Sequence, residues 1–263
     1  MGDVIGINTS ESITLTINKR IGIAKKAVYE IRSIVEDSRS QVVGGIKTGL
    51  LLWNSCVLSF LLNNSGTWIN MKKSDIERLS RLQNLFLNNL LNTFHCPIPL
   101  MYFDLAVMQI HLQILKEKLL LFHHISCLPE KAVARNILSV GQQLNLPGLH
   151  VDVDPFLLEH EIIDVTKFSK VEWKTHIVKI LESENRKDLI QKARNYKKLD
   201  YISMSLEDYE IKDYFSSLDL EKARVRFKDR AQCLTTCRRQ FPSEFIKTTF
   251  ACPGCNTGSI YVV

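Results

Sequence analysis

The spacing of apolar residues in segment 13–39 constrains the fold of this chain more than any other sequence feature. These residues stand alternately four and three positions apart, at Ile17, Ile21, Ala24, Val28, Ile31 and Val35. An α-helix completes a turn every 3.6 residues, so this spacing places all six on one helical face. Such a face must be buried against other elements. We therefore predict a long amphipathic helix within a packed helical assembly.

Helical patterns recur along most of the remaining chain. We predict a buried apolar helix over 46–62, a turn at 63–68 and a following helix that Ser74 caps. Further helices are expected at 101–125, 129–145, 169–199 and 216–241. Only 11 Gly and 7 Pro occur in 263 residues, which disfavours a turn-rich β architecture. The sequence therefore predicts a mostly α fold.

One segment has the composition of a linker between two halves of the chain. Residues 147–156, PGLHVDVDPF, contain two prolines and two aspartates. Prolines and polar residues between periodic segments are typical of loops. We therefore expect a first helical region before this segment and a basic helical region after it, over 157–249.

Composition excludes several classes of protein. Hydrophobic residues make up 45% and charged residues 24%, which is typical of a globular chain rather than a disordered one. The N-terminus lacks a basic stretch followed by an apolar core, so no secretory signal is predicted. The most apolar stretch, 49–62, is too short to span a bilayer. Seven cysteines without a secretory context indicate reduced thiols. We expect a cytoplasmic or nuclear protein that is neither secreted nor membrane-bound.

The positive charge is concentrated toward the two ends of the chain. Residues 1–100 carry 11 basic and 7 acidic side chains, residues 101–165 carry 4 and 8, and residues 166–263 carry 19 and 13. In the first predicted helix, basic residues recur at seven-residue intervals on stripes beside the apolar face: Lys19, Lys25, Lys26, Arg32 and Arg39. Basic stripes can contact phosphates, although most charged helix faces are simply solvated.

A second basic helix is predicted over 222–239. Its candidate phosphate contacts are Arg224, Arg226, Lys228 and Arg230. The alternative is that these side chains only flank an apolar face formed by Ala223, Phe227, Ala231 and Leu234. The sequence leaves both interpretations open.

Signs of enzymatic chemistry are few. There is no glycine-rich phosphate loop, HExxH, GxSxG or Asp-Asp pair in the sequence. His123 and His124 are expected to be core or surface residues rather than metal ligands, because no partner ligand follows at helical spacing. Asp152 and Asp154 are expected in a solvated loop rather than in a cation site. We therefore expect no enzymatic activity.

Four cysteines near the C-terminus have spacing compatible with zinc. Cys252 and Cys255 form a CxxC pair, and Cys233 and Cys237 lie four apart on a predicted helix. All four could close one tetrahedral thiolate site. The alternative is that the helical pair are small hydrophobic residues. Zinc is the only cofactor that the sequence suggests.

Several segments together resemble a known protein family. They are NKRIGIAKKAVYEIRSIVED, GGIKTGLLLWNSCVLSFLLNNSGTW, LQNLFLNNLL, PIPLMYFDLAVMQIHLQILKEKLLLFHHI and LDLEKARVRFKDRAQCLTTCRRQFP. In this order they resemble the region after the palm in reverse transcriptases of arthropod-type non-LTR retrotransposons. The resemblance covers nearly the whole chain, and MGDVIG resembles the family's turn at the end of the palm.

The resemblance implies a domain organisation. Residues 1–12 would correspond to the turn after the palm, and 13–146 to thumb-like and linker helices. The tail, 250–263, would be a truncated cysteine knuckle. In the family a His and a Cys follow the first cysteine pair, and neither follows Cys255. The resemblance therefore implies a fragment that begins after the palm and ends inside the knuckle.

The resemblance also implies a function. The family's parent enzyme is an RNA-directed DNA polymerase whose palm aspartates hold two metal ions, and these aspartates have no counterpart here. The remaining region implies contact with RNA or an RNA–DNA hybrid. A palm-containing polypeptide or a second copy are further expected partners, through apolar surface at Ile13, Leu15 and Ile17. The alternative is a helical interaction or scaffold protein, or a decayed retroelement product, without a nucleic-acid role.

Overall fold

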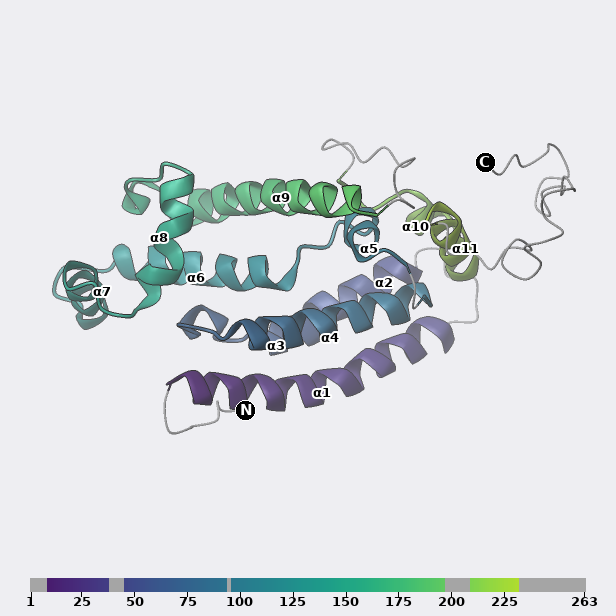
Figure 1. Cartoon of the computed structure of the whole chain (residues 1–263), viewed down its shortest axis with the longest axis horizontal. Helices are drawn as coiled ribbons and strands as arrows, with labels where there is room; N and C mark the ends of the chain where they lie inside the picture. Colours follow the sequence, from purple (N-terminus) through teal and green to yellow (C-terminus); the bar gives the residue numbers. More distant parts are fainter. Residues whose placement is uncertain (1–8, 38–44, 94–95, 197–208, 232–263) are drawn as a thin grey trace, which may run out of the picture.

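The computed structural model of the chain describes residues 9–37, 45–93, 96–196 and 209–231. Every regular element in these residues is helical, which confirms the predicted mostly α fold. The longest helices are α1 (Thr9–Asp37), α4 (Lys73–Leu91), α6 (Ile110–Ser126) and α9 (Lys170–Arg194). They stack in this order, each against the next (Figure 1). The shorter helices are α2 (Gly45–Leu52), α3 (Ser59–Leu61), α5 (Ile98–Asp104), α7 (Val133–Gln143), α8 (Leu149–Glu159), α10 (Tyr214–Ser217) and α11 (Leu220–Arg230).

Helix α1 buries the apolar face that its sequence predicts. Ile17, Ala24 and Val28 are buried, and the helix packs in parallel against α4. The parallel direction follows from two contacts near its ends. The Thr14 hydroxyl donates to Asp75 over 2.8 Å, and Arg32 donates to the Asn89 side chain over 3.3 Å. The helix begins at Thr9, inside the predicted N-terminal segment 1–12.

The predicted buried helix over 46–62 consists of α2, a π-helical turn at Trp53–Leu58 and α3. The Trp53 ring stacks on Phe86 of α4, with ring centroids 4.4 Å apart. Gly49 lies where α2 crosses α4, and a Cβ atom there would collide with the Leu90 side chain. A larger residue at this position would therefore require the end of the Leu90 side chain to move.

Two boundaries differ from the sequence prediction. Helix α4 begins at Lys73 with Lys72 as its N-cap, so Ser74 lies inside the helix and does not cap it. The predicted helix over 101–125 is broken into α5 and α6. The break includes Ala106, whose φ of 49° is incompatible with a continuing right-handed helix.

The predicted linker at 147–156 is wrong, because this segment forms most of α8. Leu149, Val153 and Phe156 are buried at helical spacing. Their burial stabilises the helix even though Pro155 lies within it and lacks a backbone donor. The composition indicated a loop because this short segment contains two prolines and two aspartates.

The buried residues form two cores. The first core joins α1, α2, α4, α5 and α11, and includes Ile17, Trp53, Phe86, Phe103 and Phe227. The second core joins α6, α8 and α9, and includes Leu119, Val153, Trp173, Ile177 and Leu181. Both cores are filled mainly by aliphatic and aromatic side chains, so apolar burial stabilises each of them.

Helix α9 contributes to both cores. Ser169 and Glu172 form a capping box at its start. Its buried residues recur every four positions: Trp173, Ile177, Leu181, Asn185, Leu189 and Ala193. Four residues overshoot a helical turn by about 40°, so the buried stripe winds about 200° around the helix. The first half of α9 therefore faces the second core, and Leu189 and Ala193 face the first.

Helix α7 lies at the end of the molecule beside α8 and has no buried residue (Figure 1). It falls within the predicted helix 129–145. Its apolar face is exposed: Val133 by 72%, Ile137 by 67% and Val140 by 47%, followed by Leu144 at 64%.

Among the described residues, no helix is both long and apolar enough to cross a membrane.

Candidate nucleic-acid interface

Three of the predicted binding residues lie on the outer face of α1. Lys19 and Lys26 are exposed opposite the buried stripe, and Lys25 is exposed on the side of the helix nearer α4. Within the described ranges, no carboxylate forms an ion pair with any of the three. Their charges are therefore available to a ligand without breaking an existing pair.

Arg32 has a different environment from these lysines. It is half-buried, and its Nε atom lies 3.0 Å from a Glu36 carboxylate oxygen. Its hydrogen bond to Asn89 joins α1 to α4. Arg32 therefore mainly joins α1 to α4, and Glu36 partly neutralises its charge. Arg39 lies outside the described residues.

Two arginines that the sequence analysis did not select lie beside these lysines. Arg78 donates to Asn18 of α1 and to Asp75, and Arg81 is 78% exposed at 3.9 Å from Glu77. Asn18, Lys25 and Arg32 lie seven residues apart and share one edge of α1. Because Asn18 and Arg32 both contact α4, Lys25 borders α4 as well. Only the pairing of the two helices reveals this.

We define the basic face as Lys19, Lys25 and Lys26 of α1 together with Arg78 and Arg81 of α4. It combines three ammonium groups that have no ion-pair partner among the described residues with two guanidinium groups that have carboxylate partners. Arg78 keeps 34% of its side chain exposed although its partner Asp75 is fully buried. The arrangement can therefore contact several phosphates along one line.

Arg224 does not belong to any exposed basic surface, which contradicts its prediction as a phosphate contact. Its side chain is 2% exposed. Its Nε donates to the Leu90 carbonyl over 2.9 Å, and its Nη atoms lie 3.3 Å from Glu36 and 2.8 Å from Glu221. Every nitrogen has a protein partner, so Arg224 ties α11 to α4 and α1. Its role is structural.

The other basic residues of α11 vary in exposure. Arg226 is 66% exposed and lies 3.6 Å from Asp229, and Lys228 is half-buried. Ala223, Phe227 and Ala231 are buried, which confirms the apolar face proposed as the alternative for this helix. Leu234 lies outside the described residues. Helix α11 is therefore mainly a core element, with accessible cations at Lys222, Arg226 and Lys228.

Arg230 pairs with a buried carboxylate. Its Nε lies 2.9 Å from Asp104, which also accepts a hydrogen bond from the Tyr214 hydroxyl over 2.9 Å. Burial raises the pKa of the Asp104 carboxyl, and the charge of Arg230 opposes part of that rise. Because Asp104 is fully buried, this pair fixes α11 against α5.

The apolar surface predicted at the start of α1 is mostly absent. Ile13 and Ile17 are 5% and 0% exposed, because both face α1's neighbours in the first core. Leu15 is 38% exposed. The larger exposed apolar face belongs instead to α7, which lies at one end of the molecule beside α8 (Figure 1).

The histidine and aspartate predictions had mixed outcomes. His123 is buried with its Nε2 atom 3.0 Å from the Phe168 carbonyl, and its ring stacks on Trp173, which confirms a core role. Asp152 is not in a solvated loop: it lies in α8, 2.7 Å from the nearly buried Lys118 ammonium. This ion pair joins α8 to α6.

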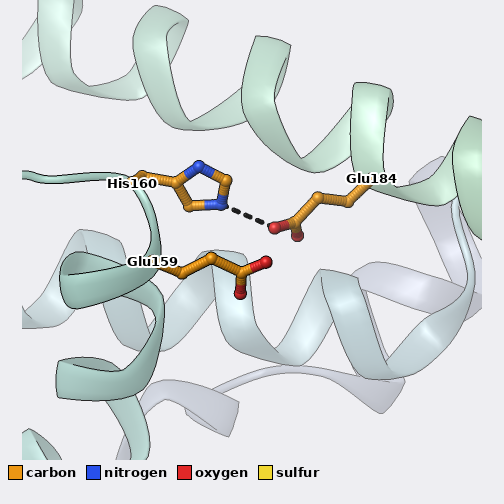
Figure 2. A group of neighbouring side chains, drawn as sticks. All are labelled: Glu159, His160 and Glu184. Atoms are coloured by element: carbon orange, nitrogen blue, oxygen red, sulfur yellow. Dashed lines mark hydrogen bonds and ion pairs between the residues drawn. The ribbon is translucent and has the colours of Figure 1, made fainter.

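The four predicted zinc ligands Cys233, Cys237, Cys252 and Cys255 lie outside the described residues. The described residues instead bring together Glu159, His160 and Glu184 (Figure 2). Nothing in the sequence indicated this group, since 24 positions separate His160 from Glu184 and only the packing of α8 on α9 joins them.

Comparison with known proteins adds no further information on the basic face or this group. No protein family model, no curated protein and no solved structure matches the chain. The residues and their geometry therefore carry the functional inference.

Proposed function

We propose that this chain is a non-catalytic nucleic-acid-binding protein that resembles the thumb and linker of a retrotransposon reverse transcriptase. Its ligand would be the backbone of an RNA or RNA–DNA duplex, bound at the basic face. The observation that carries this proposal is the exposure of Lys19, Lys25 and Lys26 without a described acidic partner.

The geometry of α1 suits a phosphate backbone. A helix of 29 residues extends about 43 Å, and seven residues along it advance about 10 Å. Lys19 and Lys26 therefore present two charges on one line at that spacing. Lys25 and the two arginines of α4 widen the line on one side. Contacts of this kind position a duplex without reading its sequence.

The proposal predicts a defined salt dependence. Each phosphate that a cation neutralises releases counterions, and the logarithm of the binding constant falls by about 0.9 per contact for each tenfold rise in salt. Three lysines acting together would contribute a slope of about −3. A palm-containing polypeptide is a further proposed partner, because the resemblance places such a domain before the thumb.

Fluorescence anisotropy with a short labelled RNA duplex and an RNA–DNA hybrid, across a salt series, tests the proposal. The variant carrying Lys19→Ala, Lys25→Ala and Lys26→Ala should lose at least about tenfold in affinity and most of the salt slope. The matched control changes Lys174, Lys179 and Lys187, which are exposed on α9, to Ala. It removes the same charge and should bind as the parent does.

Two outcomes would contradict this proposal. Equal losses in both triple variants would mean that binding depends only on net charge. No binding at low salt would favour the alternative, a helical interaction or scaffold protein. One observation supports that alternative independently, namely the exposed apolar face of α7. Concentration-dependent mass in analytical ultracentrifugation would then identify self-association.

A further inference from the structure

We propose that Glu159, His160 and Glu184 form a binding site for a divalent transition-metal ion of the zinc type. One ligand atom from each residue lies within 4.8 Å of the other two. The His160 Nε2 atom is 2.6 Å from a Glu184 carboxylate oxygen, and Figure 2 shows the Glu159 carboxylate directed toward the same space. The site is remote from the basic face, because it lies on the α8–α9 side of the stack.

The three ligands are held by elements that the second core fixes. Glu159 is the last residue of α8 and His160 follows it, while Glu184 lies in the middle of α9. Phe156 packs against the His160 ring with centroids 4.5 Å apart and restricts its orientation. The backbone then turns away at Glu161, whose φ is 54°. The carboxylate and the imidazole are therefore placed together before any ion binds.

The ligand types select the class of ion. An imidazole nitrogen with two carboxylates suits Zn²⁺ and related transition metals, whereas Ca²⁺ and Mg²⁺ prefer oxygen ligands alone. The side chains of His160 and Glu184 are 23% and 25% exposed, so an ion can reach them while much of the surrounding water is excluded. Three protein ligands would leave a coordination position for water.

The present distances require only small movements. Ligand atoms about 2.1 Å from a tetrahedral zinc ion lie about 3.4 Å from one another. That value falls between the 2.6 Å of the His160–Glu184 contact and the 4.8 Å limit of the group. The metal would replace this hydrogen bond, and the ring proton would reside on Nδ1, which points away from both carboxylates (Figure 2).

The surrounding charge favours a cation. Residues 149–164 contain five carboxylates and no Lys or Arg. One of these, Glu159, belongs to the site, and Glu161 follows it two positions later; both side chains are exposed. Arg186 on α9 lies 4.0 Å from the Glu182 carboxylate and over the Tyr209 ring, 5.1 Å from its centroid. A divalent ion would reduce the local excess of negative charge.

Isothermal titration calorimetry with zinc chloride tests the site on the full chain. The parent for this test carries Cys233→Ser, Cys237→Ser, Cys252→Ser and Cys255→Ser, because thiolates elsewhere would compete for zinc. We expect one zinc ion per chain. His160→Ala and Glu184→Gln should each weaken binding by at least about tenfold, the lower end of what loss of even an indirect partner of a metal ligand costs.

Two matched controls and one spectrum make the test specific. His124→Ala and Glu130→Gln remove an exposed histidine and an exposed carboxylate outside the site, and should leave zinc binding unchanged. Cobalt bound in place of zinc should show ligand-field bands without thiolate charge-transfer absorption. If His160→Ala disturbs the fold, Glu184→Gln retains the side-chain shape and decides the question.

The inference is overturned if the parent binds no zinc more tightly than His160→Ala and Glu184→Gln do. Loss of zinc binding in His124→Ala to the same extent would also overturn it. The outcome is independent of the proposed function, because His160→Ala should retain the RNA affinity of the parent.

Discussion

The two cores of this molecule are built from different parts of the chain. The second core joins α6, α8 and α9 and draws its residues from positions 112–181. The first core joins α1 to α11, and Arg224 within it reaches Glu36 across 188 positions and Leu90 across 134. Closing such long loops costs more conformational entropy. The second core can therefore form locally, whereas the first requires both ends of the described chain.

The surfaces over the two cores also differ in the side chains that they expose. The first core carries the basic face on α1 and α4, and the second carries the Glu159–His160–Glu184 group and the apolar face of α7. We infer that a phosphate ligand and a metal ion would bind to separate halves of the molecule. Helix α9 contributes buried residues to both cores and so joins the two halves.

The largest expected effect comes from removing the central tryptophan of each core. Trp53→Ala and Trp173→Ala should each lower the free energy of unfolding by about 3–5 kcal/mol, because both side chains are fully buried. Trp173 also donates to the Leu119 carbonyl over 3.0 Å, so its loss removes a buried hydrogen bond as well as apolar contacts. Urea denaturation followed by circular dichroism measures both changes.

We expect a single unfolding transition in both variants, because α9 couples the cores. Unfolding of Trp173→Ala in two steps would contradict this coupling of the cores. Amide hydrogen exchange would then show protected amides in α1 and α4 after those of α6 and α8 had exchanged.

A smaller effect distinguishes structural from accessible arginines in the first core. Arg224→Met should cost about 1–3 kcal/mol, because it leaves the Leu90 carbonyl without its donor and removes two ion pairs whose acids are partly solvated. Arg226→Met, at an exposed position, should change stability by less than about 0.5 kcal/mol. Denaturation midpoints of the two variants provide the measurement, and equal shifts would refute the structural role.

The third prediction concerns the apolar face of α7. Replacing Ile137 and Val140 with Ser should change stability by less than about 0.5 kcal/mol per site, because neither side chain is buried. The same change should lower the fluorescence of a bound hydrophobic dye, since this face is the largest exposed apolar stripe along a described helix. Ser139→Ala serves as the control. Unchanged dye fluorescence would place the dye site elsewhere.

The smallest effect is a pH dependence at His111. This residue lines a cavity of about 120 Å³ with Lys118 and Asp152. Burial lowers the pKa of His111, Lys192 lowers it further, and Asp188 opposes the change. The unfolded chain therefore binds a proton at this histidine more readily than the folded chain does. Folding stability falls as the pH decreases through the ordinary histidine pKa of about 6.5.

His111→Gln removes this titration and should flatten the fall between about pH 7 and pH 5. Urea midpoints of the parent and the variant at both pH values measure it. Parallel pH profiles would show that the titration of His111 does not contribute to folding stability.

Helix positions were predictable where the apolar period was regular. The four-and-three spacing from Ile17 to Val35 located α1, and helices were also expected in the segments that form α4 and α9. Prediction failed at α8, where Pro155 and the aspartates outweighed the buried Leu149 and Val153. It also failed at Ala106, because nothing in the local pattern indicates a positive φ. These positions depend on packing partners far away in the sequence.

The candidate sites were only partly predictable for the same reason. The sequence placed Lys19, Lys25 and Lys26 on a polar stripe because that stripe is fixed by α1 alone. It could not predict that Arg224 is buried and Arg226 is exposed, because their environments depend on how α11 packs on α4. The proximity of His160 to Glu184 is likewise a property of the assembled second core.

The winding of the buried stripe along α9 has a consequence for how this chain can change in length. One residue inserted between Leu181 and Leu189 would rotate everything after it by about 100°. Trp173 and Ile177 would stay in the second core, while Leu189 and Ala193 would turn away from the first. Four inserted residues would restore the direction to within about 40° but shift it by about 6 Å. The middle of α9 should therefore tolerate substitutions far better than insertions or deletions.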